Sequence, residues 1–298
     1  MSCANHGTRH MIVRIATRRS SLAMWQAKAI AKALVAADPS IEPQMVGVET
    51  KVDKDLTIPI SSFAGKGAFC KEVQNLVLAG EADIAVHSSK DMQVVDVPGL
   101  SIAGYIERGD ARDCLIGSRL DGLAKGATIA TGSARRRAQL LERRPDLNFV
   151  ELRGNIDTRL MKVDEVDAIV MAYCALTRLG REPEVVDVLP LEDFVPQVGQ
   201  AAIAVETRSD DVSTLELCAM INHRETQLAV DAERAFLTAL DGNCDLPGGA
   251  HATIDGDQIS ILGFLSDGES KFAHSEAAGS TADDVGGTLA KALVADLD

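Results

Sequence analysis

Arginine residues stand directly after predicted strands in a chain whose overall charge is acidic. Arg18 and Ser20 follow the first predicted strand and precede a helix. The same order of strand end, small hydroxyl residue and helix start recurs at Thr131, Ser133, Arg135 and Arg136. Free N–H groups at a helix N-terminus bind anions, and a neighbouring guanidinium adds bidentate hydrogen bonds. These residues therefore predict a site for an anionic ligand.

A third turn of this kind places Arg153 and Asn155 after a strand, with Arg159 one helical turn later. Three such turns, spread over two halves of the chain, predict a polyanionic ligand held in a cleft between two domains. The alternative is that these arginines are solvated charges on helix surfaces, which we expect of Arg137, Arg143 and Arg144.

Lys90 and Asp91 follow a predicted buried strand at 83–87. A carboxylate beside a lysine in a cleft can move protons and stabilise a developing cation. A turn-capping aspartate beside a surface lysine has the same spacing, so both interpretations stay open. His87 is predicted to be a hydrogen-bonded residue at the strand end rather than a metal ligand, because no second ligand lies close in sequence.

Cys244 lies in a loop that contains glycine and proline, whereas Cys174 and Cys218 lie within apolar runs. An exposed thiol can act as a nucleophile or as a covalent anchor, although an incidental loop cysteine fits the sequence equally well. The six cysteines form no CxxC pair and no zinc spacing, so we expect neither a metal site nor a disulfide framework. Motifs for nucleotide phosphates, zinc proteases and serine hydrolases are also absent.

The composition excludes several classes of protein. The chain has 298 residues, 46% of them hydrophobic, which is typical of a globular protein of two or three domains. Its formal net charge of −14 argues against a nucleic-acid partner without a strong local basic patch. No apolar run approaches the ~18–20 residues of a membrane span. The polar N-terminus lacks a secretory pattern, and we expect a cytoplasmic protein.

Apolar periodicity predicts the elements that position these residues. Predicted strands cover 11–17, 45–48, 83–87, 127–131, 149–152 and 168–172, and predicted helices cover 69–78, 133–144 and 155–163. Ser20 or Ser21 is expected to cap a first helix that buries Leu22, Trp25, Ala29, Ile30 and Leu34 on one face. Alternating strands and helices favour parallel sheets covered on both faces.

The last third of the chain changes character. The run at 202–206 predicts a strand that returns to the first domain, and helices are predicted at 214–220 and 225–240. Strands at 251–254 and 258–264 flank Asp255-Gly256, and a final helix spans 281–297. We therefore predict an α/β fold. Two α/β domains (1–106 plus 201–221, and 107–200) flank a cleft, and a small α+β C-terminal domain (222–298) follows.

Short motifs occur in a fixed order along the whole chain. They are Arg14-Ile-Ala-Thr-Arg-Arg-Ser20, Leu22-Ala-Met-Trp-Gln26, Gly65-Lys-Gly-Ala-Phe69, Ala82-Asp-Ile-Ala-Val-His-Ser88 with Lys90-Asp91, Leu152-Arg-Gly-Asn155, Thr158-Arg159, Arg178-Leu-Gly180, Val198-Gly-Gln200 and the Cys244 loop. In this order they make the chain similar to the porphobilinogen deaminases (hydroxymethylbilane synthases). The chain departs from that family's pattern at Ser62, Met92, Gln93, Ala130 and Ala201, which predicts altered local loop conformations.

The resemblance implies two domains like periplasmic binding proteins and a small domain that carries a cofactor cysteine. It implies that Cys244 holds a dipyrromethane through a thioether. It further implies a transferase of heme and tetrapyrrole biosynthesis, which joins four porphobilinogen molecules head to tail, with loss of ammonia, into hydroxymethylbilane. A monomer with no partner other than this small substrate is expected.

The resemblance also assigns residue roles. Asp91, Arg18 and Lys90 are the expected catalytic residues. The cofactor is expected to contact Cys244, Lys90, Asp91, Thr131, Ser133, Arg135, Arg136 and Arg159. Porphobilinogen is expected to contact Arg18, Ser20, Gln26, Arg153, Arg159 and Arg178. Each pyrrole unit carries an acetate and a propionate, so the product chain is a polyanion, in agreement with the arginine-bearing turns.

The main alternative is a non-catalytic protein of the same two-domain fold that binds a small anion. Such a solute-binding protein would need export or a membrane anchor, and it would have no use for Cys244. A ligand-sensing regulator would need a DNA-binding segment, and no helix-turn-helix pattern is evident in the sequence.

Overall fold

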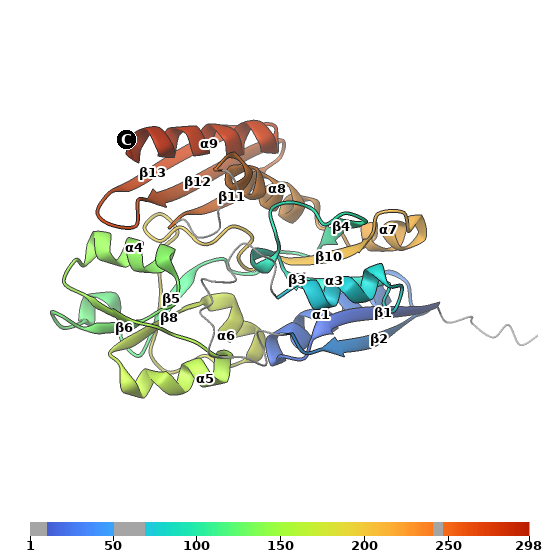
Figure 1. The fold of residues 1–298 in the computed structure, drawn as a ribbon, viewed down its shortest axis with the longest axis horizontal. Coiled ribbons are helices and arrows are strands. Elements are labelled where there is room, and N and C mark those ends of the chain that lie inside the picture. The colour runs from blue at the N-terminus through green and yellow to red at the C-terminus, as the bar shows by residue number, and fades with distance from the viewer. Residues whose placement is uncertain (1–10, 51–68, 241–246, 298) are drawn as a thin grey trace, which may run out of the picture.

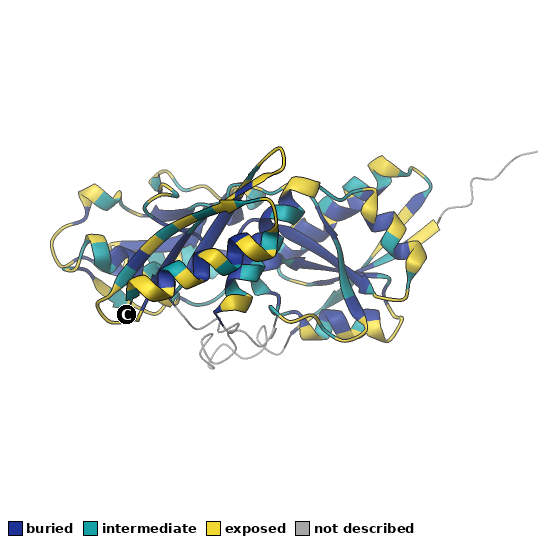
Figure 2. Cartoon of the chain, turned by 90° about the horizontal axis from the view of Figure 1, so that it is seen from above, coloured by how far each residue is buried: buried dark blue, intermediate teal, exposed yellow. Residues whose placement is uncertain are grey.

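A computed structural model describes residues 11–50, 69–240 and 247–297, and within them the strands form three sheets. Figure 1 shows three lobes, with the C-terminal sheet above the other two. Cys244 and the Gly65-Lys66 part of the sequence motif lie outside the described residues. Figure 2 shows that most strands of the sheets are buried and that exposed residues gather on helix faces and turns.

The first sheet contains five strands in the order β2-β1-β3-β10-β4. They are β1 (Met11–Arg18), β2 (Ile41–Val48), β3 (Ile84–Ser88), β4 (Leu100–Tyr105) and β10 (Ile203–Arg208). Helices α1 (Ser21–Ala37), α3 (Lys71–Leu78) and α7 (Val212–Ala219) contact these strands. The predicted returning strand is confirmed as β10, whereas β4 was not predicted from the sequence.

The second sheet contains five strands in the order β7-β6-β8-β5-β9. They are β5 (Asp113–Ile116), β6 (Thr128–Ala130), β7 (Asn148–Val150), β8 (Ala168–Ala172) and β9 (Val186–Val188). Helices α4 (Ala134–Arg143), α5 (Ile156–Met161) and α6 (Tyr173–Leu179) alternate with them along the chain. The sequence pattern located β6, β7 and β8, whereas β5 and β9 were not predicted from the sequence.

The prediction of parallel sheets is wrong, because both sheets are mixed. Strand β10 runs antiparallel to β3 and β4, and β5 runs antiparallel to β8 and β9. Ile203 at the start of β10 pairs with Ser88 at the end of β3, and Asp113 at the start of β5 pairs with Ala172 at the end of β8. Each crossing segment thus enters its new sheet at the carboxyl ends of the parallel strands. It therefore has to run in the opposite direction.

The C-terminal unit is a three-stranded antiparallel sheet with two helices. Strands β11 (Gly249–Asp255), β12 (Gln258–Ser266) and β13 (Phe272–Gly279) pair in sequence order, and α8 (Arg224–Ala239) and α9 (Ala282–Leu297) pack against them. Phe236 of α8 and Leu289 and Leu293 of α9 are completely buried in its core. The predicted α+β character is confirmed, and β13 is an additional strand.

Helix α1 begins as predicted and buries Ile30 and Leu34 as predicted, but the rest of its buried face differs from the prediction. The Ser20 side chain accepts a hydrogen bond from the Ala23 N–H and caps the helix. The buried residues are Ala23, Gln26, Ala27, Ile30, Ala31 and Leu34. Trp25 remains 37% exposed, because its ring lies beneath the Arg178 guanidinium of α6 instead of in the core. A stacking contact with a side chain of helix α6 therefore replaces the expected core contact.

None of the helices in the described part of the chain combines the length and apolarity that crossing a membrane requires.

Ala201 adopts a left-handed backbone conformation at the point where the chain returns to the first sheet. Its φ is +67°, and among the described non-glycine residues it alone has a positive φ. Its carbonyl oxygen accepts hydrogen bonds from the Gly109 N–H at 3.2 Å and from Arg178 Nη2 at 2.6 Å. An L-residue in this conformation costs about 1–2 kcal/mol, which these contacts must offset.

We expect Ala201→Gly to stabilise the protein by about 0.5–1 kcal/mol, because glycine removes the strain but gains more entropy in the unfolded chain. Urea unfolding monitored by circular dichroism measures this difference. The matched control is Ala202→Gly, at a buried neighbour without a positive φ, which should lose stability. An Ala201→Gly variant no more stable than its parent would contradict the assigned strain.

Candidate functional site

A buried carboxylate organises the arginines of the second sheet. Asp113, at the start of β5, is 1% exposed. Its Oδ2 accepts a hydrogen bond from Arg135 Nη2 at 2.8 Å, and its Oδ1 accepts from Arg136 Nη2 at 2.7 Å. Burial alone would raise the pKa of Asp113, but Arg135 and Arg136 outweigh it and hold that pKa well below its usual range. Asp113 is therefore ionised at neutral pH.

The two arginines lie where the sequence placed them, at the start of α4. Strand β6 ends at Ala130, and Ser133 caps the helix by accepting from the Arg136 N–H at 3.4 Å. Both terminal nitrogens of Arg135 donate to protein acceptors, Asp113 and the Val195 carbonyl oxygen. Arg135 therefore supports the cluster from within the core.

Arg136 differs from Arg135 in that part of its guanidinium is left without a protein acceptor. Its Nε is buried and has no hydrogen-bond partner among the described residues. Its Nη1 donates to the Val170 carbonyl oxygen at 3.2 Å. A buried, unsatisfied donor on a cation is costly unless an acceptor approaches it. Arg136 Nε therefore keeps unused hydrogen-bonding capacity within the described part of the chain.

Gln200 connects this cluster to the first sheet. Its Nε2 donates to Asp113 Oδ1 at 2.8 Å and to the Ala111 carbonyl oxygen at 2.7 Å. Its Oε1 accepts from Lys90 Nζ at 3.2 Å. Burial lowers the pKa of Lys90, and Arg136 lowers it further, whereas Asp91 opposes the shift. The residues predicted on separate domains therefore meet across Gln200.

Arg159 completes the positive side of this site. It lies near the end of the first turn of α5, which Asn155 caps, and its Nε donates to the Gly154 carbonyl oxygen at 2.8 Å. Burial and the neighbouring Arg136 lower the pKa of Arg159 to about 10, while Asp91 raises it. The mutual repulsion of Arg159 and Arg136 would be relieved by a bound carboxylate.

Asp91 ends a single 3-10 turn, Ser89–Asp91, directly after β3. The sequence prediction that this strand delivers Lys90 and Asp91 to its carboxyl end is confirmed. His87, one of the buried strand residues, pairs with Glu206 at 3.2 Å, so its predicted role as a hydrogen-bonded residue is confirmed as well.

The first sheet contributes further predicted residues to the same end of its strands. The Arg18 guanidinium lies 4.5 Å from the centre of the Phe69 ring. Gln26 of α1 is buried, and its Nε2 donates to Ser88 Oγ at 2.7 Å. Ser20 and Gln26 thus have structural hydrogen bonds of their own. Among these side chains, Arg18 is the one that brings a positive charge.

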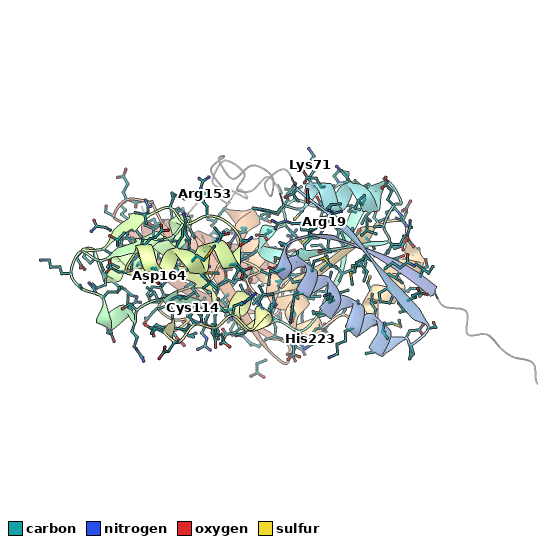
Figure 3. The ribbon with its side chains drawn as sticks, turned by 90° about the horizontal axis from the view of Figure 1, so that it is seen from below. Arg19, Lys71, Cys114, Arg153, Asp164 and His223 are labelled. Carbon is teal, nitrogen blue, oxygen red and sulfur yellow. The ribbon has the colours of Figure 1, made fainter. Side chains whose placement is uncertain are left out.

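The remaining predicted arginines lie at the interface of the two sheets and on the second lobe. The Arg178 guanidinium lies 5.4 Å from the centre of the Trp25 ring, and burial lowers its pKa. Figure 3 shows Arg153 on the lobe of the second sheet and Arg19 on the lobe of the first. Thr131 is 2% exposed, and its Oγ1 accepts from the Ser133 N–H at 3.2 Å.

Two residues that the analysis of spacing did not select hold the site together. Asp113 lies in a short strand that carries no amphipathic pattern, so no local feature identifies it. Gln200 ends the Val198-Gly-Gln200 motif, which marked the segment without indicating its contacts. Cys244, the predicted covalent anchor, lies outside the described residues. Within the described ranges, no group of three His, Cys, Asp or Glu side chains is arranged to hold a metal ion.

Comparison with known proteins identifies matches over nearly the whole chain. Residues 13–216 match the family described as "Porphobilinogen deaminase, dipyromethane cofactor binding domain", and residues 227–295 match "Porphobilinogen deaminase, C-terminal domain". A porphobilinogen deaminase of Trichlorobacter lovleyi is 41% identical over 290 residues, covering 95% of this chain and 93% of the relative. The corresponding protein of Syntrophomonas wolfei is 41% identical, covering 95% of each chain.

Solved structures show weaker likeness. YhfZ from Shigella flexneri has a TM-score of 0.40 at 18% identity and covers 72% of this chain and 92% of its own. The LysR family transcriptional regulator CbnR has a TM-score of 0.44 at 10% identity and covers 72% of this chain and 69% of its own. Likeness at this level says nothing about function.

We expect Asp113→Asn to lower the free energy of unfolding by about 3–5 kcal/mol, because it leaves two buried guanidinium groups without their counter-charge. The contribution of Asp113 is present above its unfolded pKa. The difference between parent and variant should therefore stay constant from about pH 8 to about pH 5 and shrink as the pH falls through about 4.

Urea unfolding at a series of pH values measures this difference. The matched control is Asp110→Asn, which removes a half-exposed carboxylate paired with Arg112 and should cost less than about 1 kcal/mol. Equal losses for the two variants would contradict the central position of Asp113.

Proposed function

The chain belongs to the porphobilinogen deaminase family, and from this premise we propose how its residues divide the work of the reaction. The enzyme polymerises four porphobilinogen molecules head to tail into the linear tetrapyrrole hydroxymethylbilane and releases ammonia. It does so with a dipyrromethane cofactor, and the family region matched by residues 13–216 is described as the domain that binds this cofactor. The assignments below concern which side chains bind, orient and stabilise.

The observation that carries the assignment is the unsatisfied, buried Arg136 Nε beside Arg159 and Lys90. A dipyrromethane presents several carboxylates on a short, rigid frame, so it requires closely spaced cations. Burial is the main cause of the lowered pKa values of Lys90 and Arg159, and the nearby charge of Arg136 lowers both further. Bound carboxylates would remove this repulsion, and the residues present therefore fit the cofactor.

In this proposal the cofactor is attached through Cys244 and held at its carboxylates by Lys90, Arg136 and Arg159. When bound, it supplies the primer to which pyrrole units are joined. Thr131 and Ser133 form the hydroxyl-bearing turn in front of α4. Arg135 contributes by fixing Asp113, to which it donates at 2.8 Å. Charge-assisted hydrogen bonds of this kind are about twice as strong as neutral ones.

Porphobilinogen itself is assigned to the first-sheet side of the cleft and its rim. Arg18 is the proposed partner of an incoming carboxylate, with Ser20 and Gln26 shaping the adjacent surface. The rim is completed by Arg153, Arg159 and Arg178. Because Arg178 also donates to the Ala201 carbonyl oxygen, it couples substrate contact to the segment that joins the sheets.

Asp91 is the proposed catalytic carboxylate. Loss of ammonia from porphobilinogen leaves positive charge on its pyrrole ring. A carboxylate held at the pyrrole N–H interacts more strongly with that cation than with the neutral substrate, and it therefore lowers the barrier rather than merely strengthening binding. Asp91 can also accept the proton that is lost when aromaticity is restored after each addition. Lys90 and Arg159 keep it in a positive surrounding.

We also propose the domain boundaries, the localisation and the oligomeric state of the enzyme. A division at 106/107, 200/201 and 221/222 agrees with the sheet to which each strand belongs. We assign a cytoplasmic, monomeric protein with no nucleic-acid partner, in keeping with its net charge of −14. The competing function is a non-catalytic binder of small anions, which would need neither Cys244 nor Asp91.

We expect Cys244→Ser to yield folded protein without stably attached cofactor and with little activity, because a hydroxyl is far less nucleophilic than a thiol. Intact mass spectrometry of the purified proteins measures attachment directly. The matched control is Cys114→Ser, which alters a buried thiol in β5 and should keep the cofactor mass. Cofactor mass retained on Cys244→Ser would contradict the anchor, and its absence from the parent would favour the anion-binding alternative.

We expect Asp91→Asn to reduce single-turnover consumption of porphobilinogen by about 10²–10³-fold, because the electrostatic stabilisation is lost. Asp91→Glu should be impaired less, since it keeps the charge but displaces it by ~1 Å. Both variants should retain the cofactor mass and the thermal stability of the parent. Turnover by Asp91→Asn within about tenfold of the parent would contradict the electrostatic role.

A further inference from the structure

Cys70 is a buried thiol that the reaction as described does not use. It stands immediately before α3, is 1% exposed, and belongs to an apolar cluster with Met92 and Tyr105. Its Sγ donates a hydrogen bond to the backbone carbonyl oxygen of Asp91 at 3.3 Å. The thiol therefore contacts the main chain of the proposed catalytic residue rather than a ligand.

The turn that carries Asp91 is fixed at several other points. The Ser89 N–H donates to the Ala202 carbonyl oxygen at 3.0 Å, and Gln197 Nε2 donates to the Lys90 carbonyl oxygen at 3.2 Å. Gly199 approaches so closely that a Cβ there would lie 2.6 Å from Ser89 Oγ. These contacts hold the beginning and middle of the turn against the returning segment. Cys70 holds its last carbonyl group, the one nearest the Asp91 side chain.

A polar network behind Cys70 restricts its position. His87 Nε2 contacts Glu206 Oε2 at 3.2 Å, and Gln74 Nε2 donates to the same oxygen at 2.9 Å. Burial alone would lower the pKa of His87, but the charge interaction and hydrogen bond with Cys70, followed by those with Glu206, outweigh it and raise that pKa to about 10. His87 thus lies between Glu206 of β10 and Cys70, and the side chains of Cys70, His87, Glu206 and Gln74 are all buried.

We propose that Cys70 is a positioning residue, whose hydrogen bond to the Asp91 carbonyl oxygen, backed by His87, Glu206 and Gln74, sets the orientation of the catalytic carboxylate. The inference rests on the proposed function of Asp91. A displacement of ~1 Å at a catalytic group can cost about a hundredfold in rate. Release of a single carbonyl anchor should allow part of that displacement.

The test compares kcat and KM for porphobilinogen in cofactor-loaded enzymes, with cofactor content measured by intact mass. Cys70→Ala removes the donor, and Cys70→Ser retains one of similar size. The matched control is Cys218→Ala, which removes an equally buried thiol from α7 without any contact to the Asp91 turn. Each substitution is also made in the Asp91→Glu background, so that coupling can be separated from general loosening.

We expect Cys70→Ala to lower kcat about tenfold with KM within about twofold, and Cys70→Ser to restore most of the loss. Cys218→Ala should lose comparable thermal stability but keep kcat. In the Asp91→Glu background, Cys70→Ala should cost less than about twofold, because the carboxylate is already displaced.

Two results would overturn the inference while leaving the proposed function intact. One is a loaded Cys70→Ala enzyme at full kcat beside an inactive Asp91→Asn enzyme. The other is a kcat loss of equal size in the parent and Asp91→Glu backgrounds, which would indicate a general structural role. A fully active Asp91→Asn enzyme would overturn the catalytic assignment and this inference together.

Discussion

One buried carboxylate, Glu233 of α8, holds the three parts of the molecule in a fixed arrangement. It is fully buried and accepts two hydrogen bonds from Arg108, at 2.5 and 3.1 Å. It also accepts from the Gly199 N–H at 2.7 Å and from the Ala252 N–H at 2.9 Å. Arg108 lies in the segment that leads from the first sheet to the second, Gly199 in the segment that returns, and Ala252 in the C-terminal sheet. These three parts of the chain thus meet at the Glu233 side chain. An unpaired charge at this depth would be prohibitive, so all of its partners are required together.

The position of Lys90 relative to Asp113 depends on that junction, because Gln200 lies in the segment that returns to the first sheet. Arg108 Nε donates to the Gln200 carbonyl oxygen at 2.8 Å, and the Gln200 side chain joins Lys90 to Asp113. Close contact continues to the third sheet, where a Cβ at Gly249 would lie 2.4 Å from the Pro196 carbonyl oxygen. Hydrogen bonds therefore connect Glu233, through Arg108 and Gln200, to the proposed catalytic turn. This network explains how charged side chains from different lobes keep fixed positions relative to one another.

A protein with a net charge of −14 should repel a polyanionic product. The arginines buried in the second lobe explain how it can nevertheless bind one. Acidic side chains dominate the composition, yet Arg135 and Arg136 lie together at the start of α4, and Arg159 lies in the last turn of α5. Asp113 neutralises part of this charge from inside the core by accepting hydrogen bonds from Arg135 and Arg136. The electrostatic field that a substrate meets is therefore set locally, and the overall charge governs only long-range repulsion.

The sequence by itself determined the elements whose patterns are local: β8, a serine cap at 20 or 21 before α1, helices that begin near Ser133 and Asn155, and the delivery of Lys90 and Asp91 at the end of β3. Ordered motifs over the whole chain also determined the family. The local elements depend on the spacing of residues within a few positions of one another. Family membership depends on many independent motif matches along the chain.

Only the tertiary structure decided the direction of β5 and β10, the exposed position of Trp25, and the partners of Asp113, Gln200, Glu233 and Cys70. Gln200 and Asp113 are 87 residues apart, and Arg108 and Glu233 are 125 apart. Nothing in the local pattern of a short strand indicates a partner at such separation. The direction of a crossing strand follows from the edge at which it enters the sheet, and that edge is fixed by how the three lobes pack.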